Sequence, residues 1–567
     1  MKCGTDIGDS RRAGFGIAWV IVIGCALCAV HVWWLPRIVV DDAFISYRYA
    51  RNLVEGHGLV FNIGERVEGY SNFLWVMLTA LGMKLGLEPI GWTRAMGAAA
   101  YIGTVALGIR LAFRLTRSLW IAMAVALLLG GSTALCGSAM SGLETGLFGF
   151  LIMAALSATF EGRLTLASTL LGLSAITRPE GLGLCVLAVV LTAAYPAGRS
   201  RRWAETARVA IPAFLLVGGL MLFRLGYYGA LMPNSVQAKS AMLPLLARAT
   251  WGERAALIFN EPGWGYVADF IRYTFGPVVV FAFIPIWIAL RRTWRHSTVA
   301  EPMDAGAVRL KSLKATRQSR VIILAAAFSA MGLAVAVYNF GDWMSSFRLL
   351  TPYLAPLTIL VALGIRTAVL RLRRRAGVAW LAPARFSAAL AVLLCAVGQF
   401  QWQRPTAGGS PDLELASILS ESSEPALLAS TDVLGRLGYY APKAPILDMA
   451  GLTNAHIARH GTPKPPFGRN DFAYVLSCKP HFIMNNVRTA WRRHLHRTEF
   501  RDHYWWVDRA AWTWDGAAMG KPRFVFVRRG SVLEREIRSR YSDAIFRSPS
   551  ELGRTDSDGQ LAVGMGR

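Results

Sequence analysis

The sequence predicts a polytopic α-helical membrane protein with a C-terminal α/β domain outside the membrane. Of its 567 residues, 54% are hydrophobic and only 17% are charged, and the mean hydropathy is +0.38. This composition is typical of a chain with many membrane spans and excludes an ordinary soluble domain. Long apolar segments recur through residues 1–401, which form the predicted membrane domain, whereas residues 402–547 lack them.

The first apolar segment, residues 15–36, is long enough to cross a bilayer, which takes ~20 residues. Trp33 and Trp34 near its end are typical of a membrane interface. Arg11 and Arg12 before it resemble the start of a signal peptide. The apolar run is long and lacks a small-residue cleavage site, so we predict an uncleaved first span.

Ten further apolar segments follow, which makes about 11 predicted transmembrane helices. Several are shorter than ~20 residues, so they must tilt or lie behind other helices. The segments are residues 91–113, 118–135, 143–160, 164–177, 181–195, 207–225, 271–290, 321–339, 349–366 and 384–400.

Basic loops set the predicted orientation. Lys and Arg gather after the second span, between the sixth and seventh spans, in residues 291–320 and in residues 371–375. With eleven spans, all of these loops lie on the side of the N-terminus, which the positive-inside rule makes cytoplasmic. The apolar segment 71–87 must then be a juxtamembrane or re-entrant helix, because another crossing would reverse every later loop. The net charge of +26 is therefore explained by the basic cytoplasmic loops, and we expect no nucleic-acid partner.

The sequence of residues 402–547 predicts a small α/β domain on the extracytoplasmic side. Short apolar stretches at 425–430, 445–448, 481–485 and 523–528 are typical of strands between helical stretches. Residues 548–567 are rich in Gly, Ser and charge and predict a disordered tail.

Asp41 and Asp42 are the first candidate functional residues, because they directly follow the first span. Charges at a membrane boundary are costly to position and often functional. The alternative is that they only cap the helix that follows.

Further polar residues fall in the turns that this topology places on the same outer side. If these turns converge, they form a polar cleft at the membrane surface that suits a sugar phosphate on a lipid tail. Cations would bind the phosphate, and carboxylates would contact the sugar and the attacking hydroxyl. The alternative for any single Arg is snorkelling or pairing between helices. The candidates are Arg48, His57, Glu68, Tyr70, Glu144, Arg178, Glu180, Arg224, Tyr227, Lys239, Asp342 and Arg348.

This set of residues can support sugar transfer from a phosphodiester donor. The acceptor hydroxyl needs one general base, best supplied by an Asp, and a cationic clamp stabilises the departing phosphate. The clamp is expected among Arg178, Arg224, Lys239 and Arg348. A single base opposite the leaving group predicts inversion. The sequence indicates no metal site and no cofactor besides the donor lipid.

Residues 41–75 (DDAFISYRYARNLVEGHGLVFNIGERVEGYSNFLW) resemble the first outer loop of GT-C glycosyltransferases. SGLET (141–145), TRPEG (177–181), RLGYYGALMPNS (224–235), GDWMSSFRLLTP (341–352) and residues 432–454 resemble further motifs of one branch. That branch holds the terminal β-arabinofuranosyltransferases of actinobacterial cell walls and related pilin arabinofuranosyltransferases.

The resemblance implies a GT-C fold, catalytic Asp41 and Asp42 with the first as base, and a polyprenyl-phosphate sugar as donor. It also implies arabinofuranose as the sugar and a cell-envelope glycan or glycoprotein as acceptor, at the outer face of the cytoplasmic membrane. Two alternatives stay open: a lipid-linked glycan transporter or flippase, and a GT-C enzyme that uses another sugar such as mannose. A transporter often shows an internal repeat and places ionisable residues near the midplane, and the sequence shows neither.

Overall fold

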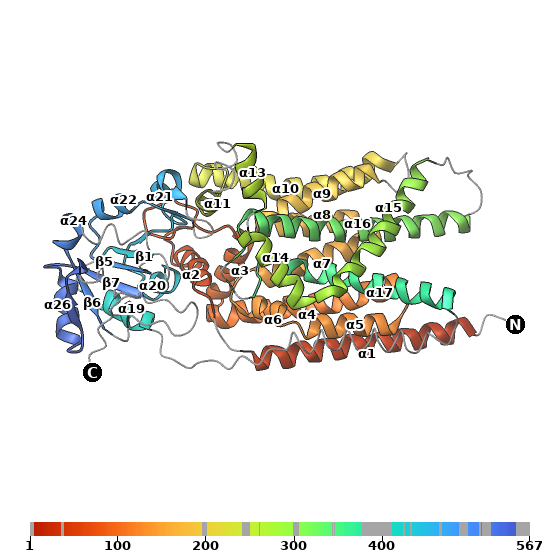
Figure 1. Ribbon diagram of the computed structural model, residues 1–567, viewed down its shortest axis with the longest axis horizontal. Helices are drawn as coiled ribbons and strands as arrows, with labels where there is room; N and C mark the ends of the chain where they lie inside the picture. Colours follow the sequence, from red (N-terminus) through yellow and green to blue (C-terminus); the bar gives the residue numbers. More distant parts are fainter. Residues whose placement is uncertain are drawn as a thin grey trace.

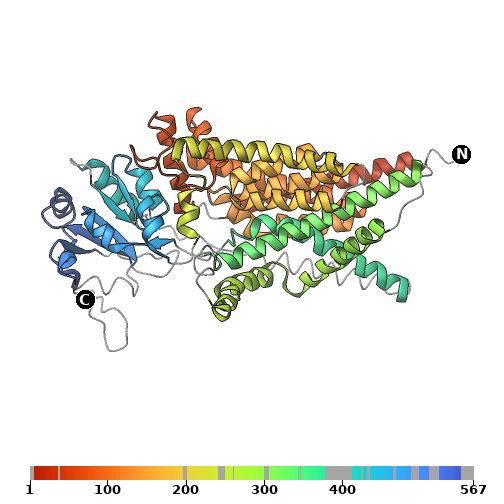
Figure 2. The same cartoon turned by 90° about the horizontal axis from the view of Figure 1, so that it is seen from above.

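The computed structural model describes residues 5–35, 39–195, 201–240, 250–259, 261–298, 306–342, 344, 346–376, 411–422, 426–430, 434–463, 468–486, 497–509, 512 and 523–550. A long bundle of helices makes up one part of the molecule, and a region built on a β-sheet lies at one end of it (Figure 1). The N-terminus lies at the opposite end of the bundle, which the second view also shows (Figure 2).

Six helical segments are long and apolar enough to cross a membrane, and a helix pair bent by 50° gives up to seven. The chain is therefore a multi-pass membrane protein. The segments belong to α1 (Thr5–Trp34), α4 (Pro89–Thr116), α10 (Arg202–Tyr228), η2 with α15 (Gly276–Ala282 and Phe283–Thr298), α16 (Gly306–Tyr338) and η3 with α17 (Thr351–Tyr353 and Leu354–Ala376), and the bent pair is α5 (Leu119–Gly130) with α6 (Thr133–Met140).

Three shorter apolar helices match three further predicted spans. They are α7 (Thr145–Glu161), α8 (Leu164–Thr177) and α9 (Glu180–Ala194), and α8 packs against both α7 and α10. The predicted span at 384–400 lies outside the described residues. The count of eleven spans therefore stays a prediction.

Two short helices, α2 (Asp41–Val54) and α3 (Phe73–Lys84), lie where the bundle meets the sheet region (Figure 1). They pack against each other, and α2 also packs against α20 (Leu434–Tyr440) of the sheet region. The apolar segment 71–87 thus forms a helix of only 12 residues, and its juxtamembrane or re-entrant position stays a prediction.

The C-terminal region contains a six-stranded sheet with the order β2-β1-β5-β7-β6-β8. β1 (Leu428–Ser430) pairs in parallel with β2 (Ile446–Asp448) and β5 (Phe482–Asn486). β7 (Arg523–Arg528), β6 (Tyr504–Asp508) and β8 (Ile545–Arg547) add antiparallel pairs.

All four predicted strands are present as β1, β2, β5 and β7, whereas β6 and β8 were not predicted. β6 is rich in aromatic residues, and its Trp506 packs into the core opposite Phe526 of β7. A two-stranded pair joins β3 (Thr462–Pro463) to β4 (Arg469–Asn470). The boundary at 401–402 and most of the predicted tail, residues 551–567, lie outside the described residues.

Helices cover the sheet. In addition to α20 they are α19 (Pro411–Glu421), α21 (Ala455–His460), α22 (Phe472–Ser477), α24 (Thr498–Arg501) and α26 (Val532–Arg540). α11 (Asn234–Lys239) packs against α21 of this region, whereas α14 (Glu261–Thr274), which follows α13 (Trp251–Ile258), packs against α16 of the bundle.

Close packing of α4 on α6 depends on Gly97. A Cβ atom at this position would lie 1.9 Å from the carbonyl oxygen of Ala139. We expect Gly97→Ala to force the two helices apart and to lower the free energy of unfolding by ~1–3 kcal/mol. Thermal unfolding in detergent measures this.

Gly218→Ala is the matched control, because a Cβ atom there meets nothing within 4 Å. Alanine is also favoured over glycine within a helix by ~0.5–1 kcal/mol. Equal midpoints for the two variants would contradict the packing described for α4 and α6.

Candidate active site

A cavity of about 320 Å³ lies where the bundle meets the C-terminal region. Its walls come from α2, the loop before α3, the turns before α7 and α9, α11 and the loop after α16. The structure therefore brings the predicted outer turns together. The predicted site residues that line the cavity are Asp42, Tyr70, Glu144, Arg178, Glu180, Lys239, Asp342 and Arg348.

Asp42 lies in the first turn of α2 and lines the cavity. Its Oδ2 accepts a hydrogen bond from Nη1 of Arg348 at 2.9 Å, and Arg348 also donates to Asp342. Burial favours the neutral acid, but the positive charges of Arg348 and Lys239 outweigh it and hold the pKa of Asp42 below its usual value. Asp42 is therefore ionised at neutral pH.

Arg178 forms a second ion-pair group on another wall of the cavity. It donates to Glu144 at 2.9 Å and to Glu180 at 2.9 Å. The C-terminal end of α8 and the start of α9 place this Arg, because the helix ends at Thr177 and the chain turns through Pro179. Asn72 supports the group by donating to Oε2 of Glu144 at 2.8 Å.

Lys239 differs from the two arginines because it has no ion-pair or hydrogen-bond partner among the described residues. It is the last residue of α11 and its side chain is accessible from the cavity. The surrounding protein and the nearby charge of Arg348 lower its pKa. Of the cavity's described cations, Lys239 is the one that an anion can approach without breaking an existing ion pair.

Asp41 points away from the cavity and contacts the C-terminal region. Its two carboxylate oxygens accept hydrogen bonds from the backbone N–H groups of Gly435 at 2.9 Å and Arg436 at 2.8 Å, in the first turn of α20. A Cβ atom at Gly435 would lie 2.1 Å from the carbonyl oxygen of Asp41, so only glycine allows this approach. Burial raises the pKa of Asp41 to about 7, although both hydrogen bonds oppose this shift.

The structure places the remaining predicted site residues outside the cavity. Arg48 is buried and donates to the carbonyl oxygens of Phe61, Gly438 and Ala444. It joins α2 to its own loop and to the C-terminal region. His57 is exposed near the start of the loop after α2.

Glu68 and Arg224 form a buried ion pair at 2.9 Å between the first loop and α10. Burial raises the pKa of Glu68 to about 7, against the effect of Arg224. Tyr227 lies nearby, and its hydroxyl accepts a hydrogen bond from the N–H group of Leu59 at 3.0 Å. Arg224 therefore cannot belong to a clamp within this cavity, whereas Arg178, Lys239 and Arg348 can.

One wall of the cavity was not predicted, because it comes from the C-terminal region. Leu452 lines the cavity from the loop after β2. Asn234 holds this loop by donating to the carbonyl oxygens of Gly451 at 2.8 Å and Leu452 at 2.9 Å. In the sequence, residues 432–454 resemble a motif of the arabinofuranosyltransferase branch. This resemblance does not predict that the loop with Leu452 reaches the cavity.

No group of three or more His, Cys, Asp or Glu in the described part of the chain is arranged to hold a metal ion. The carboxylates of the cavity are separated by Arg178 and Arg348, which bind to them instead.

The arrangement of the helices matches known structures along most of the chain. The archaeal oligosaccharyltransferase AglB from Archaeoglobus fulgidus, in complex with an inhibitory peptide and a dolichol-phosphate, superposes with a TM-score of 0.52 and 10% identity. The match covers 95% of this chain and 76% of that chain. The Archaeoglobus fulgidus oligosaccharyltransferase in the apo form also gives a TM-score of 0.52, with 10% identity, over 87% of this chain and 73% of that chain. The chain has the GT-C fold. The fold predicted from the first outer loop is thus confirmed.

Two curated proteins are similar to this GT-C chain in sequence, and both are named terminal β-(1→2)-arabinofuranosyltransferase. The protein from Corynebacterium glutamicum is 31% identical over 271 residues, which are 42% of this chain and 36% of that protein. The protein from Mycobacterium tuberculosis is 28% identical over 375 residues, which are 60% of this chain and 55% of that protein. The matched parts thus span about a third to about half of the length of these relatives. The predicted likeness to arabinofuranosyltransferases is confirmed.

A family model described as a domain of unknown function, DUF8728, matches residues 398–527. This segment contains α20 and the loop with Leu452, so it supplies both contacts between the C-terminal region and the site.

We expect Asp41→Ala to loosen α20 from α2. The change leaves the N–H groups of Gly435 and Arg436 buried without these acceptors, and each such loss typically costs ~1–3 kcal/mol. Hydrogen exchange at residues 434–440 should become about tenfold faster or more.

Asp471→Ala is the matched control. Asp471 also caps a helix of the C-terminal region, by accepting from the N–H group of Tyr474 at 3.0 Å, but it does not contact α2. Unchanged exchange at 434–440 in Asp41→Ala, or an equal increase in Asp471→Ala, would contradict this role of Asp41.

Proposed function

We propose that this chain is an integral membrane glycosyltransferase that transfers arabinofuranose from a polyprenyl-phosphate donor. The acceptor is a cell-envelope glycan or glycoprotein at the outer face of the cytoplasmic membrane. One observation carries the proposal: an ionised carboxylate, Asp42, shares a cavity at the end of the helix bundle with the unpaired cation Lys239. The GT-C fold and the similarity to arabinofuranosyltransferases support it.

The reaction follows from the positions of these charges. Asp42 takes the proton of the acceptor hydroxyl as its oxygen attacks the anomeric carbon of the sugar. The bond from that carbon to the phosphate oxygen breaks, and the lipid phosphate leaves with the bonding electron pair. Lys239 and Arg348 stabilise the negative charge that develops on it. Attack opposite the leaving group inverts the anomeric centre.

This assignment exchanges the roles that the family resemblance favours for the two carboxylates. Asp42 lines the cavity, whereas both oxygens of Asp41 accept N–H groups of α20. Asp41 is then a positioning residue, which holds the first turn of α2 so that Asp42 faces the substrate. The two residues differ because neighbours on a helix point ~100° apart.

The proposed orientation rests on the distribution of charge. The Arg-rich ends of α4, α10, α15 and α17 lie at the end of the bundle far from the sheet region, which is the cytoplasmic side by the positive-inside rule. The cavity and the C-terminal region then face the outer side, where a lipid-linked donor is the available source of sugar. The membrane lipids also supply the path by which the polyprenyl tail reaches the cavity.

A direct assay separates this proposal from its alternatives. The purified chain is incubated with polyprenyl-phosphoryl arabinofuranose or polyprenyl-phosphoryl mannose and an envelope glycan acceptor, and release of the lipid phosphate is measured. Release from the arabinose donor alone supports the proposal. Release from the mannose donor alone indicates another sugar. Lipid movement across a vesicle membrane without release indicates a flippase.

The Asp42→Asn variant should lose the proton acceptor while keeping the size and polarity of the side chain. We expect single-turnover transfer to fall by ~10²–10⁴-fold. Asp41→Asn, expressed at a matched level, should lose less. A near-normal rate in Asp42→Asn with loss only in Asp41→Asn would return the base role to Asp41. Normal rates in both would contradict the enzymatic role of this cavity.

Lys239→Gln should weaken binding of the donor. A charge-assisted contact is typically worth ~1.5–3 kcal/mol, so the donor KM should rise about tenfold or more. Arg224→Gln is the control, because Arg224 pairs with Glu68 outside the cavity. It should lower stability without changing the donor KM. An unchanged KM in Lys239→Gln, or an equal rise in Arg224→Gln, would place the phosphate elsewhere.

A further inference from the structure

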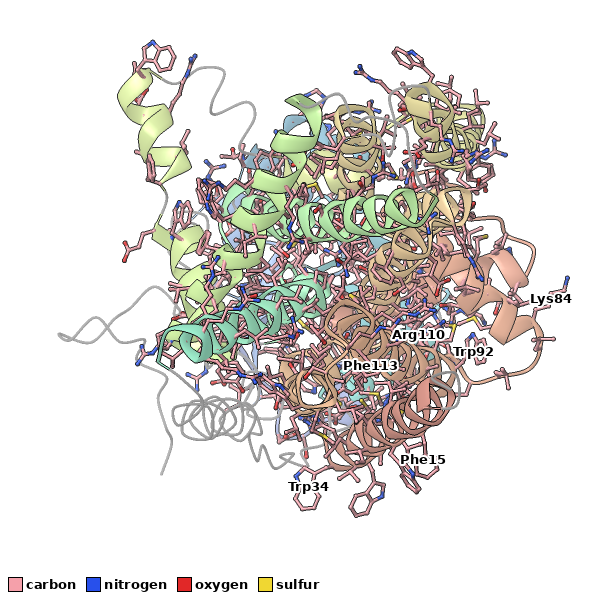
Figure 3. All side chains as sticks on the ribbon, turned by 90° about the vertical axis from the view of Figure 1, so that its right-hand side faces the viewer. Phe15, Trp34, Lys84, Trp92, Arg110 and Phe113 are labelled. Atoms are coloured by element: carbon pink, nitrogen blue, oxygen red, sulfur yellow. The ribbon has the colours of Figure 1, made fainter. Side chains whose placement is uncertain are left out.

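Three arginines contact the carboxylate of Glu161 at the end of the bundle that lies far from the sheet region, and a fourth contacts the backbone carbonyl oxygen of the same residue. Arg110 Nη2 and Arg163 Nε lie 3.1 and 3.4 Å from the carboxylate oxygens of Glu161, and Arg114 Nη1 donates to the same group. Arg317 Nη1 donates to the carbonyl oxygen of Glu161 at 3.3 Å. Figure 3 looks onto this end, with Arg110 labelled.

The backbone brings these groups together from separate elements. Arg110 and Arg114 lie one turn apart in α4, Glu161 ends α7, Arg163 precedes α8, and Arg317 lies in α16. The turn from α7 to α8 passes through Gly162, which has a φ of 79°. A Cβ atom at Gly162 would lie 2.6 Å from Cζ of Arg317, so the guanidinium lies directly on the turn.

The charges of this cluster do not balance. The cluster holds four guanidinium groups and one carboxylate, which three of them contact, so three positive charges have no counter-ion among the described residues. The cations are also accessible, since the side chains of Arg110 and Arg163 are 54% and 67% exposed. Guanidinium groups this close repel one another, and a bound anion would relieve the repulsion.

We propose that Arg110, Arg114, Arg163 and Arg317 bind the phosphate of an anionic phospholipid headgroup. Guanidinium forks match phosphate oxygens in pairs, and basic pockets between membrane helices are suited to such headgroups. Apolar surface lies beside the cations, because Leu166, one turn along α8 from Arg163, is 44% exposed. An acyl chain on the same lipid would cover it. The proposal does not depend on the transfer reaction.

Lipid retention by the purified full-length chain tests this site. The chain is stripped of lipid in detergent and titrated with dioleoyl-phosphatidylglycerol or dioleoyl-phosphatidylcholine, and binding is followed by native mass spectrometry. We expect tighter binding of phosphatidylglycerol. Arg110→Gln/Arg163→Gln should weaken it about tenfold or more, since each Arg near a charged surface accounts for about fivefold. Equal affinity for both lipids would overturn the proposal.

A matched control separates a specific site from the general charge of this face. Arg371→Gln/Arg373→Gln removes the same charge from exposed positions on α17, outside the cluster. This pair should keep phosphatidylglycerol binding, and so should Arg110→Lys/Arg163→Lys at least in part. Equal loss in the α17 pair would overturn the proposal, because it would mean that any basic residue on this face contributes equally.

Two further measurements test the chemistry of the ligand. Glu161→Gln removes the competing carboxylate, so phosphatidylglycerol should bind more tightly. Unchanged or weaker binding in a variant with a normal unfolding midpoint would overturn the proposal. If Glu161→Gln does not fold, the comparison of Arg110→Gln/Arg163→Gln with Arg371→Gln/Arg373→Gln tests the proposal instead. Inorganic phosphate should displace the lipid only weakly, since it has no acyl chain. Displacement at concentrations similar to those of the lipid would instead indicate a soluble anion as the ligand.

Discussion

The contact between α2 and α20 is the interaction on which the candidate site depends. Asp41 accepts two backbone N–H groups of α20, and Arg48 donates to carbonyl oxygens beyond it at Gly438 and Ala444. Arg51 adds a bond of 2.6 Å to the carbonyl oxygen of Tyr439. These bonds join residues that are about 390 positions apart in the chain, and they satisfy backbone groups that would otherwise be buried without partners. Because α2 is held on one side in this way, its other side, with Asp42, is fixed toward the cavity.

The charges around the cavity are arranged for position more than for stability. Arg348 lies between Asp42 and Asp342, and Arg178 lies between Glu144 and Glu180. Removing such charges from water is costly, so buried ion pairs contribute little net stability. They do hold each side chain in one geometry, which a reaction that needs a placed base and a placed cation requires. Lys239, without such a pair, remains available to an incoming anion.

Arginine side chains are balanced by carboxylates at one end of the helix bundle and outnumber them at the other end. At the end near the sheet region, each arginine of the cavity has two carboxylates, and the loop with Leu452 forms part of one wall. At the far end, four arginines share Glu161 and remain accessible. The first arrangement suits binding of one substrate in a fixed orientation. The second suits the boundary of a membrane, where mobile anions balance the charge.

The sequence by itself determined the fold class and the outer turns of the site. Apolar runs of membrane length and alternating basic loops indicate a multi-pass helical protein without knowledge of any contact, because the bilayer requires them locally. The strands β1, β2, β5 and β7 were likewise visible as short apolar stretches between turns. Eight of the predicted site residues line the cavity, since residues at one end of successive spans must meet at one face.

Only the tertiary structure decided which side each residue faces. Asp41 and Asp42 are equivalent in the sequence, and the docking of α20 separates them. Arg224 and Lys239 are both cations near span ends, yet one is paired with Glu68 and the other faces the cavity. Leu452 enters the wall from a region that is distant in the chain. These outcomes depend on contacts between segments hundreds of residues apart, and no local pattern of residues encodes such contacts.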